Sequence, residues 1–394
     1  MKRICVVGNF SGRNAGDAAI LECLLEDVYA RHRDVEFLVP TINSRFVSQS
    51  YSRFPVKPVP LMPWNLSLKI FGVPIFRAVL SSDLVLLTDA ILFDLKLLNP
   101  LYNYLSTMAL VLPEAKRRGI PVVLYNVSLG PINTDLGKKC IKRVLDSSDQ
   151  IILRDGESLE LLRRLDLETA KVVMAADCAL NVPLPDHGRM TQIKEEEGIL
   201  QEKAQFLSFN ISSYLDVYVR GKSRGIGTER FVKIIADTMD RICREMRKKV
   251  VFVITQPMDL DIAQTVLEHL RYPENVKLIS NKEHSHNDLA GVLAEVEMHV
   301  GMRTHSIIFA TASCTPTVGI IATPKNRGYM KSIGQEERMI EFDNQFSTEK
   351  LFSLIVQTWE ERELIRKRLA PVMSKEKEKA RASAERLKQY LVQS

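Results

Sequence analysis

The chain has 394 residues, a length that exceeds one compact core and predicts two domains. Its 45% hydrophobic and 26% charged residues are typical of a folded globular protein and exclude a disordered or fibrous one. The net charge of +6 is spread along the chain. That charge is too dilute for a nucleic-acid-binding protein, and it suits an anionic substrate or a weak attraction to an acidic membrane surface.

The sequence predicts a cytoplasmic protein. Peripheral contact with the inner face of the cell membrane is compatible with this location. Its six cysteines lie far apart without a C-x-x-C pair, which predicts buried thiols in a reducing compartment. The N-terminal apolar run is too short for a signal peptide, and no run of about 20 apolar residues predicts a spanning helix. We interpret the most apolar region, residues 64–80, as a buried helix with a loop; a segment lying on a membrane surface is the alternative.

Buried strands alternate with helices along the first 180 residues, which we interpret as an N-terminal α/β domain. Strands are predicted at residues 4–8, 35–40, 83–87, 121–127, 150–153 and 171–174. Helices are predicted between them at residues 18–31, 101–118, 136–147 and 158–165. This alternation is typical of βαβ units, so we expect a parallel, Rossmann-like sheet with right-handed crossovers.

The composition changes at residues 181–204, where prolines, glycines and a run of three glutamates predict an interdomain linker; a helix over part of the acidic stretch is the alternative there. A second α/β domain is predicted at residues 205–345. Its predicted strands are 206–211, 250–255, 276–279, 296–302 and 317–321, and its predicted helices are 229–247, 261–270, 287–294 and 306–313. Residues 346–394 are predicted to be a charged helical segment with a solvated face.

Three basic side chains follow neighbouring strands of the second predicted domain. Arg303 and His305 lie between a predicted strand and a predicted helix, and Lys325 follows the next strand. The carboxyl edge of a parallel sheet, beside a helix N-terminus, is where α/β proteins bind anions. We therefore predict an anion site, the alternative being that Arg303 pairs with a surface carboxylate and His305 caps its helix.

Charged residues also follow strands of the first predicted domain. Arg154 follows the strand at 150–153, and its alternative role is an ion pair with Asp155 or Glu157 at a helix start. Asp17 either caps the first helix or binds sugar hydroxyls, because a carboxylate there would repel phosphate. Asp177 either binds sugar hydroxyls or acts as a base; the alternative is that it only forms a turn between the domains.

No metal site is predicted. The pair His284 and His286 has a spacing that suits a strand, but no cysteine or acidic cluster accompanies it. We interpret this stretch as a loop before a helix that Asn287 caps.

Several segments, taken in order, resemble the polysaccharide pyruvyl transferase family. They are residues 12–21 (GRNAGDAAIL), 130–131 (GP), 151–158 (IILRDGES), 176–177 (AD) and 301–310 (GMRTHSIIFA), followed by Pro316 and Lys325. The resemblance implies a GT-B-like fold, with two domains facing across a cleft. It also implies an enzyme that moves the carbon skeleton of phosphoenolpyruvate onto two hydroxyls of a sugar, as a ketal, with release of phosphate.

The resemblance assigns roles to particular residues. Catalysis is implied for His305, Arg154 and Lys325, and binding of phosphoenolpyruvate for Arg303 together with Arg154 and Lys325. His305 is then either the general acid or a donor to the phosphate. We predict that acceptor binding falls to Asn14, Gly16, Asp17, Asp89 and Asp177. No cofactor is expected beyond phosphoenolpyruvate as donor, and a sugar or lipid-linked glycan is the expected acceptor.

One departure from the family pattern lies after the third predicted strand. Where the family has a Gly-rich turn, this chain has Thr88-Asp89-Ala90, so a side chain replaces close backbone approach. The acceptor pocket is therefore expected to differ, which allows another acceptor or another reaction. Two other functions stay open: a GT-B glycosyltransferase that uses a nucleotide sugar, and a catalytically decayed partner in glycan biosynthesis.

Overall fold

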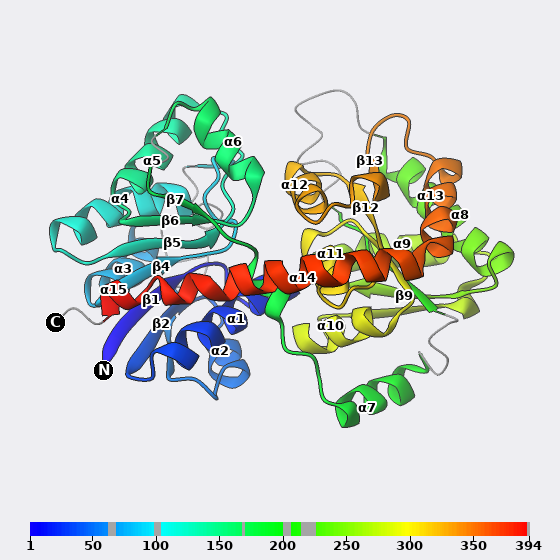
Figure 1. Cartoon of the computed structure of the whole chain (residues 1–394), viewed down its shortest axis with the longest axis horizontal. Coiled ribbons are helices and arrows are strands. Elements are labelled where there is room, and N and C mark those ends of the chain that lie inside the picture. The colour runs from blue at the N-terminus through cyan, green and yellow to red at the C-terminus, as the bar shows by residue number, and fades with distance from the viewer. Residues whose placement is uncertain (62–67, 98–103, 168–169, 200–205, 214–225, 392–394) are drawn as a thin grey trace. The chain divides into compact units, whose positions relative to one another are not determined.

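The computed structural model describes residues 1–61, 68–97, 104–167, 170–199, 206–213 and 226–391. The chain divides into two compact units. The first unit consists of Met1–Gly12, Asp17–Asn181 and Glu376–Ser394, and the second of Arg13–Gly16 and Val182–Lys375. Each unit is built around one parallel sheet (Figure 1).

The first unit has a seven-stranded sheet in the order β3-β2-β1-β4-β5-β6-β7, with every pair parallel. Its strands are β1 (Lys2–Val7), β2 (Val35–Thr41), β3 (Val56–Pro60), β4 (Leu84–Leu87), β5 (Val122–Val127), β6 (Gln150–Leu153) and β7 (Val172–Met174). Strand order reverses between β1 and β4, where Ile4 pairs with Leu84. Such a reversal point is where open α/β sheets bind ligands, beyond the carboxyl ends of the strands.

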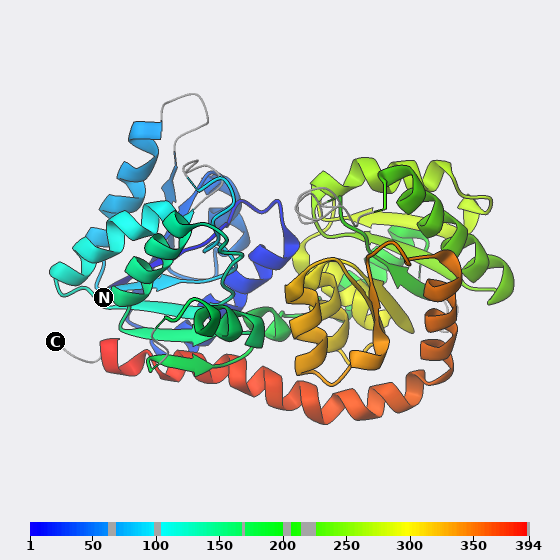
Figure 2. The same ribbon diagram turned by 90° about the horizontal axis from the view of Figure 1, so that it is seen from above.

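Helices enclose this sheet (Figures 1 and 2). They are α1 (Ala15–Arg31), α2 (Ser44–Ser50), α3 (Leu68–Leu80), α4 (Tyr104–Arg117), α5 (Asp135–Asp146), α6 (Gly156–Arg164) and α15 (Lys388–Leu391). Alternate strand residues such as Val85, Leu87 and Leu124 point to one face and pack against α3, α4, α5 and α6. The residues between them are buried as well, so both faces of the sheet are covered, as parallel sheets require.

The second unit has a six-stranded parallel sheet in the order β10-β9-β8-β11-β12-β13. Its strands are β8 (Phe206–Phe209), β9 (Lys249–Ile254), β10 (Val276–Ser280), β11 (Met298–Gly301), β12 (Thr317–Ile321) and β13 (Met339–Glu341). Its helices are α7 (His187–Glu197), α8 (Thr228–Glu245), α9 (Leu260–Glu268), α10 (His286–Glu295), α11 (Thr304–Ala312), α12 (Pro324–Ser332) and α13 (Thr348–Glu360). One face of the sheet packs on α8, α9 and α13. The order reverses between β8 and β11.

The last long helix, α14 (Arg362–Glu385), begins in the second unit and ends in the first. In the second unit, Arg366 donates to the Glu297 carboxylate over 2.6 Å. In the first unit, Asn126 Nδ2 donates to Ala380 O over 3.4 Å, and Asn181 Nδ2 donates to Lys377 O over 3.0 Å. The sequence analysis predicted the helix but not the return of residues 376–394 to the first unit.

Two parallel-sheet α/β domains and a C-terminal helix confirm the predicted fold class. Some elements were missed. Strand β3 contains Pro58 and Pro60, which lack the donors of an inner strand, and it lies at the edge of its sheet, where proline is tolerated. Helix α7 lies inside the predicted linker and includes its acidic stretch, where a helix was the alternative; its full extent was not predicted. Asp186 caps its start and Gly198, at φ +65°, ends it.

The apolar region predicted at residues 64–80 is only partly visible. Residues 62–67 lie outside the described part of the chain, and α3 then runs from Leu68 to Leu80 with Pro74 inside it. Across the described ranges, we find no helix with both the length and the apolarity to cross a membrane. None of the six cysteines, all of them described, takes part in a disulfide.

A buried acid in α1 makes the stability of the first unit depend on pH. Burial raises the pKa of Asp27 to about 6, although Arg31 and Arg381 oppose the shift. Because the folded state binds this proton more tightly, its stabilising effect is complete below the unfolded pKa and is lost as the pH rises through about 6. Asp27→Asn should therefore stabilise the first unit by about 2 kcal/mol at pH 7.5.

Urea unfolding of wild type and Asp27→Asn at pH 4, 5, 6 and 7.5 measures this effect. The difference in the free energy of unfolding should grow between pH 4 and pH 6 and then level off. Glu26→Gln is a matched control, because Glu26 neighbours Asp27 but is exposed and pairs with Arg53. A difference that stays constant across the pH range would contradict the assignment.

Candidate functional site

The second unit presents Arg303, His305 and Lys325 on one edge of its sheet. Arg303 is the N-cap residue of α11 and His305 lies in the first turn of that helix, after β11. Lys325 lies in the first turn of α12, after the adjacent strand β12. The two loops are joined, because Thr304 Oγ1 donates to Asn326 Oδ1 over 2.6 Å. The N-termini of α11 and α12, whose dipoles favour negative charge, therefore lie at the same sheet edge as these basic residues.

The guanidinium of Arg303 forms a bidentate ion pair. Its Nε lies 2.8 Å from Asp259 Oδ2, and its Nη2 lies 2.7 Å from Asp259 Oδ1. Asp259 is fully buried, and it also accepts from the main-chain N–H and the hydroxyl of Ser213, both over 2.8 Å. The partner of Arg303 is thus a buried carboxylate rather than the surface one considered as its alternative. This pair fixes the plane of the guanidinium. The side chain of Arg303 is 17% exposed.

The segment Arg13–Gly16 is packed on the same edge of the second unit. Ala15 N donates to Thr255 O over 2.9 Å, and Asn281 Nδ2 donates to Arg13 O over 3.0 Å. Asn14 Oδ1 accepts from Gly16 N over 2.9 Å and so shapes the turn. Gly16 lies directly against the imidazole of His305: a Cβ added there would be 2.0 Å from His305 Nδ1. Of the residues predicted to bind the acceptor, Gly16 is thus placed beside His305, and Asn14 is bonded to Gly16 on the second unit.

In the first unit, Arg154 follows β6 and is almost enclosed, with 7% of its side chain exposed. Its Nη1 lies 2.7 Å from Asp177 Oδ2, and its Nη2 lies 3.9 Å from Asp89 Oδ1. Burial lowers the pKa of Arg154, but Asp177, Asp89 and Asp155 outweigh that effect and raise it. The strongest ion pair is therefore with Asp177. Asp155, the alternative partner, caps α6 by accepting from Ser158 N over 2.8 Å.

Asp17 and Tyr104 belong to the same region of the first unit. Asp17 is buried in the first turn of α1, where it accepts from Asn9 Nδ2 over 3.0 Å. Burial, followed by the charges of Asp89 and Asp17, raises the pKa of Tyr104 to about 12. Asp89 and Asp177 thus place two carboxylates near the guanidinium of Arg154, and Asp17 adds an acidic group near Tyr104 in the same region. Such a set suits the hydroxyl donors of a sugar better than an anion.

Asp89 has a left-handed backbone, with φ at +68°. This conformation costs most residues about 1 kcal/mol and is the one that glycine adopts freely. The geometry explains why a glycine suits this turn. We predict that Asp89→Gly raises the free energy of unfolding of the first unit by about 0.5–1 kcal/mol relative to Asp89→Asn, because both lose the charge and only glycine relieves the backbone.

Chemical denaturation of the two Asp89 variants at one pH measures that difference. Equal stability of the two variants would show that the turn carries no strain at this position.

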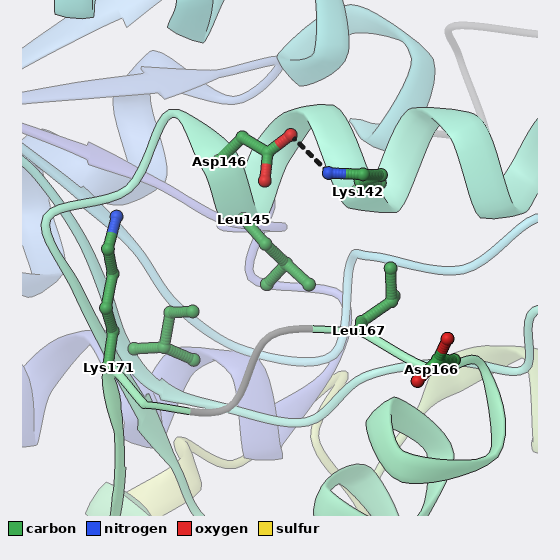
Figure 3. A pocket seen from close by; sticks show the side chains of 7 residues that line it. Lys142, Leu145, Asp146, Asp166, Leu167 and Lys171 are labelled. Atoms are coloured by element: carbon green, nitrogen blue, oxygen red, sulfur yellow. Dashed lines mark hydrogen bonds and ion pairs between the residues drawn. The ribbon is translucent and has the colours of Figure 1, made fainter.

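A small depression lined by Lys142, Leu145, Asp146 and Lys171 lies elsewhere on the first unit (Figure 3). It is formed where α5 ends and β6 and β7 begin, at the amino edge of the sheet. Lys142 there pairs with Asp146 over 2.9 Å. Since ligands of open α/β sheets bind at the carboxyl edge, this depression is distinct from the candidate site.

The His284-Ser285-His286 stretch is a loop and a helix start, as predicted, but its cap differs. Ser285 rather than Asn287 caps α10, in a capping box with Asp288, because its hydroxyl accepts from Asp288 N. His284 Nε2 lies 2.8 Å from Glu197 Oε1. Within the described ranges, we find no group of three or more side chains that could hold a metal ion.

Two polar residues that follow strands at this edge of the second unit were not predicted from the sequence. Asp259 follows β9 and holds Arg303, and Asn210 follows β8 and accepts from Arg303 N over 2.9 Å. Both lie after strands on the carboxyl edge, so the rule that selected Arg303 could also have found them. Asn210 lies at the reversal of strand order between β8 and β11.

Comparison with known proteins gives a family and a fold. The family model described as "Polysaccharide pyruvyl transferase" matches residues 14–322. The amylovoran biosynthesis protein AmsJ of Erwinia amylovora is 25% identical over 379 residues, covering 85% of this chain and 87% of that protein.

Solved structures with the same fold include UDP-GlcNAc 2-epimerase of Neisseria meningitidis, at a TM-score of 0.69 and 14% identity over 100% of both chains. Anabaena Alr3699/HepE in complex with UDP has a TM-score of 0.63 and 12% identity, again over 100% of both chains. ADP-heptose LPS heptosyltransferase II of E. coli has a TM-score of 0.52 and 12% identity, over 92% of this chain and 100% of that one. At these identities the likeness establishes the GT-B-type fold alone.

Proposed function

Since this chain belongs to the polysaccharide pyruvyl transferase family, we propose that it transfers pyruvate from phosphoenolpyruvate to a sugar of a cell-surface polysaccharide precursor. In this reaction C3 of phosphoenolpyruvate gains a proton, and C2 forms bonds to two hydroxyl oxygens of one sugar. The C2–O bond to phosphate breaks, and inorganic phosphate leaves. Of the two hydroxyl protons, one balances the proton added to C3 and the other leaves with phosphate.

The observation that carries the proposal is the set of basic residues on the second unit. Phosphoenolpyruvate has a carboxylate and a phosphate, close to three negative charges near neutral pH, and needs several cations. Lys325 and the first turns of α11 and α12 supply positive charge at one edge of the sheet, and Arg303 adds a guanidinium whose charge Asp259 balances. We assign the donor to this edge.

The carboxylates of the first unit support assigning the acceptor to that unit. Asp17, Asp89 and Asp177 accept hydrogen bonds and would repel phosphate. Arg154 already has two carboxylate neighbours, so binding a donor anion would require it to leave its 2.7 Å pair with Asp177. We retain Arg154 as a catalytic residue in the proposal, with a direct role on the donor or an indirect one through Asp177.

His305 has two candidate roles, and they differ kinetically. As the general acid it delivers the proton to C3, so His305→Gln would lower kcat while leaving the KM for phosphoenolpyruvate nearly unchanged. As a hydrogen-bond donor to the phosphate of phosphoenolpyruvate, it stabilises the bound substrate. The same change would then raise the KM, and glutamine would partly replace the lost hydrogen bond.

The decisive experiment measures phosphate release by the full chain with phosphoenolpyruvate and a panel of cell-envelope glycan lipids or their lipid-free fragments. Release that needs both substrates, together with a product heavier by one ketal-linked pyruvate, supports the proposal. No release with any acceptor would overturn it. Stabilisation against heat by UDP but not by phosphoenolpyruvate would favour a nucleotide-sugar transferase instead.

We include in the proposal a cytoplasmic location and a lipid-linked acceptor at the membrane surface. The absence of disulfides among the six cysteines is compatible with a reducing compartment. The net charge of +6 favours approach to an anionic membrane surface. Salt-sensitive binding to vesicles that contain anionic lipid, compared with neutral vesicles, tests that part separately.

A further inference from the structure

A buried histidine, His299, lies beneath the loop that carries Arg303 and His305. It occupies the middle of β11 and is fully inaccessible to solvent. Its Nδ1 lies 2.8 Å from Ser208 Oγ on the neighbouring strand β8. Its Nε2 lies 3.1 Å from Ser306 Oγ in the first turn of α11. One imidazole therefore ties the sheet to the start of the helix.

Ser306 passes this restraint to the backbone of Arg303. Its Oγ lies 2.8 Å from Arg303 O and 3.0 Å from Asn210 Oδ1. Asn210 Oδ1 accepts from Arg303 N over 2.9 Å, and Asn210 Nδ2 donates to Val253 O over 2.8 Å. Both polar groups of the Arg303 main chain are thus bonded within a network that ends at His299.

The network fixes the protonation of His299. Arg303 O and Asn210 Oδ1 carry no proton to give, so the single Ser306 hydroxyl proton goes to one of them. His299 Nε2–H then donates to Ser306 Oγ, and in the neutral imidazole Nδ1 accepts from the Ser208 hydroxyl. The imidazole is neutral in this arrangement. Burial favours the same state, because it lowers the pKa of His299 to about 3.

The packing around His299 explains the glycine that precedes Met302. A Cβ added to Gly301 would lie 2.6 Å from His299 Nε2 and 2.7 Å from Ile307 Cγ1. The imidazole therefore passes over a position that only glycine can occupy without displacing it. The hydrogen bonds to Ser208 and Ser306 and the close packing on Gly301 are thus two independent features that fit the imidazole of His299.

We propose that His299 is a positioning residue of the donor edge: it holds Ser306, and through Ser306 it restrains Asn210 and the backbone of Arg303, from which the chain continues to His305. The proposal rests on the proposed function in one respect, the identity of the donor. His299 itself touches no substrate, and its contribution is the placement of the loop.

Three substitutions of His299 separate its two bonds. Leucine removes both, asparagine can reach only the Ser208 side, and glutamine can reach Ser306. In the phosphoenolpyruvate assay, His299→Leu is expected to lower kcat/KM at least tenfold. His299→Gln should recover most of that loss and His299→Asn should not. Assays are run well below the unfolding temperature of each variant, which is measured in parallel.

A second readout does not depend on catalysis. The Nε–H resonance of Arg303, held by Asp259, reports the position of the loop in the ligand-free full chain and is assigned with Arg303→Lys. It should move in His299→Leu and in Ser306→Ala, and return in His299→Gln. Ser208→Ala is the matched control for Ser306→Ala, because it removes a hydroxyl from the opposite side of the same ring and should move the resonance less.

The proposal is overturned if the Arg303 resonance stays in place in folded His299→Leu and Ser306→Ala proteins. It is also overturned if losses in kcat/KM simply follow losses in unfolding temperature across all variants, glutamine included. If wild type releases no phosphate from phosphoenolpyruvate but the resonance moves as expected, the proposed donor fails and the positioning role stands.

Discussion

Gly16→Ala is expected to lower kcat/KM for phosphoenolpyruvate about a hundredfold, although the substitution adds a single methyl group. The added Cβ would lie 2.0 Å from His305 Nδ1 and 2.1 Å from its Cγ. No van der Waals contact is that short, so the imidazole must move or the segment Arg13–Gly16 must detach from Thr255. A displacement of about 1 Å in a reacting group is enough for a loss of this size.

Gly156→Ala is the matched control for Gly16→Ala. Gly156 also lies in the first turn of a helix, at the start of α6, and a Cβ added there meets no atom within 4 Å. The control should retain wild-type activity and stability within a factor of two. Steady-state kinetics of both glycine variants and of His305→Gln, purified in the same way, test this prediction. Activity of Gly16→Ala near the wild-type value would show that the position of His305 does not limit the reaction.

The sequence predicted the sheets well because their strands are locally encoded. Runs such as Gln150–Leu153 and Thr317–Ile321 match the structure residue for residue, since they are continuous apolar stretches buried on both faces. The return of residues 376–394 to the first unit was not predictable in this way. A charged amphipathic helix shows which face is apolar but not which sheet that face will cover.

In the candidate site, too, the locally encoded features were predicted and the tertiary contacts were not. Arg303, His305 and Lys325 were placed at strand ends by local pattern alone, and the structure has them there. Their restraints were not predicted, because Asp259 and Gly16 reach Arg303 and His305 only through tertiary packing. The left-handed φ of Asp89 was also hidden, since aspartate is a residue type that either a regular turn or a strained one accepts.

Asp259 provides the largest expected effect on stability. Asp259→Asn keeps the shape of the side chain but leaves the Arg303 guanidinium, 17% exposed, without its carboxylate. Breaking a buried ion pair from one side costs about 3 kcal/mol, because the remaining charge stays desolvated. The double variant Asp259→Asn/Arg303→Met removes both charges and should regain at least half of that loss, since the pair itself contributes less than its disruption costs.

A double-mutant cycle in urea, following the unfolding of the second unit, measures this coupling. Lys233→Met and Asp237→Asn form the control cycle, because that pair on α8 belongs to the same unit, is exposed at 68% and 33%, and should couple by about 0.5 kcal/mol or less. Asp259→Asn should also weaken phosphoenolpyruvate binding, since a guanidinium freed from its bidentate partner loses its fixed plane. If the double variant is no more stable than Asp259→Asn, the loss of stability comes from lost packing around Asp259 and Ser213. The unpaired charge of Arg303 is then not its cause.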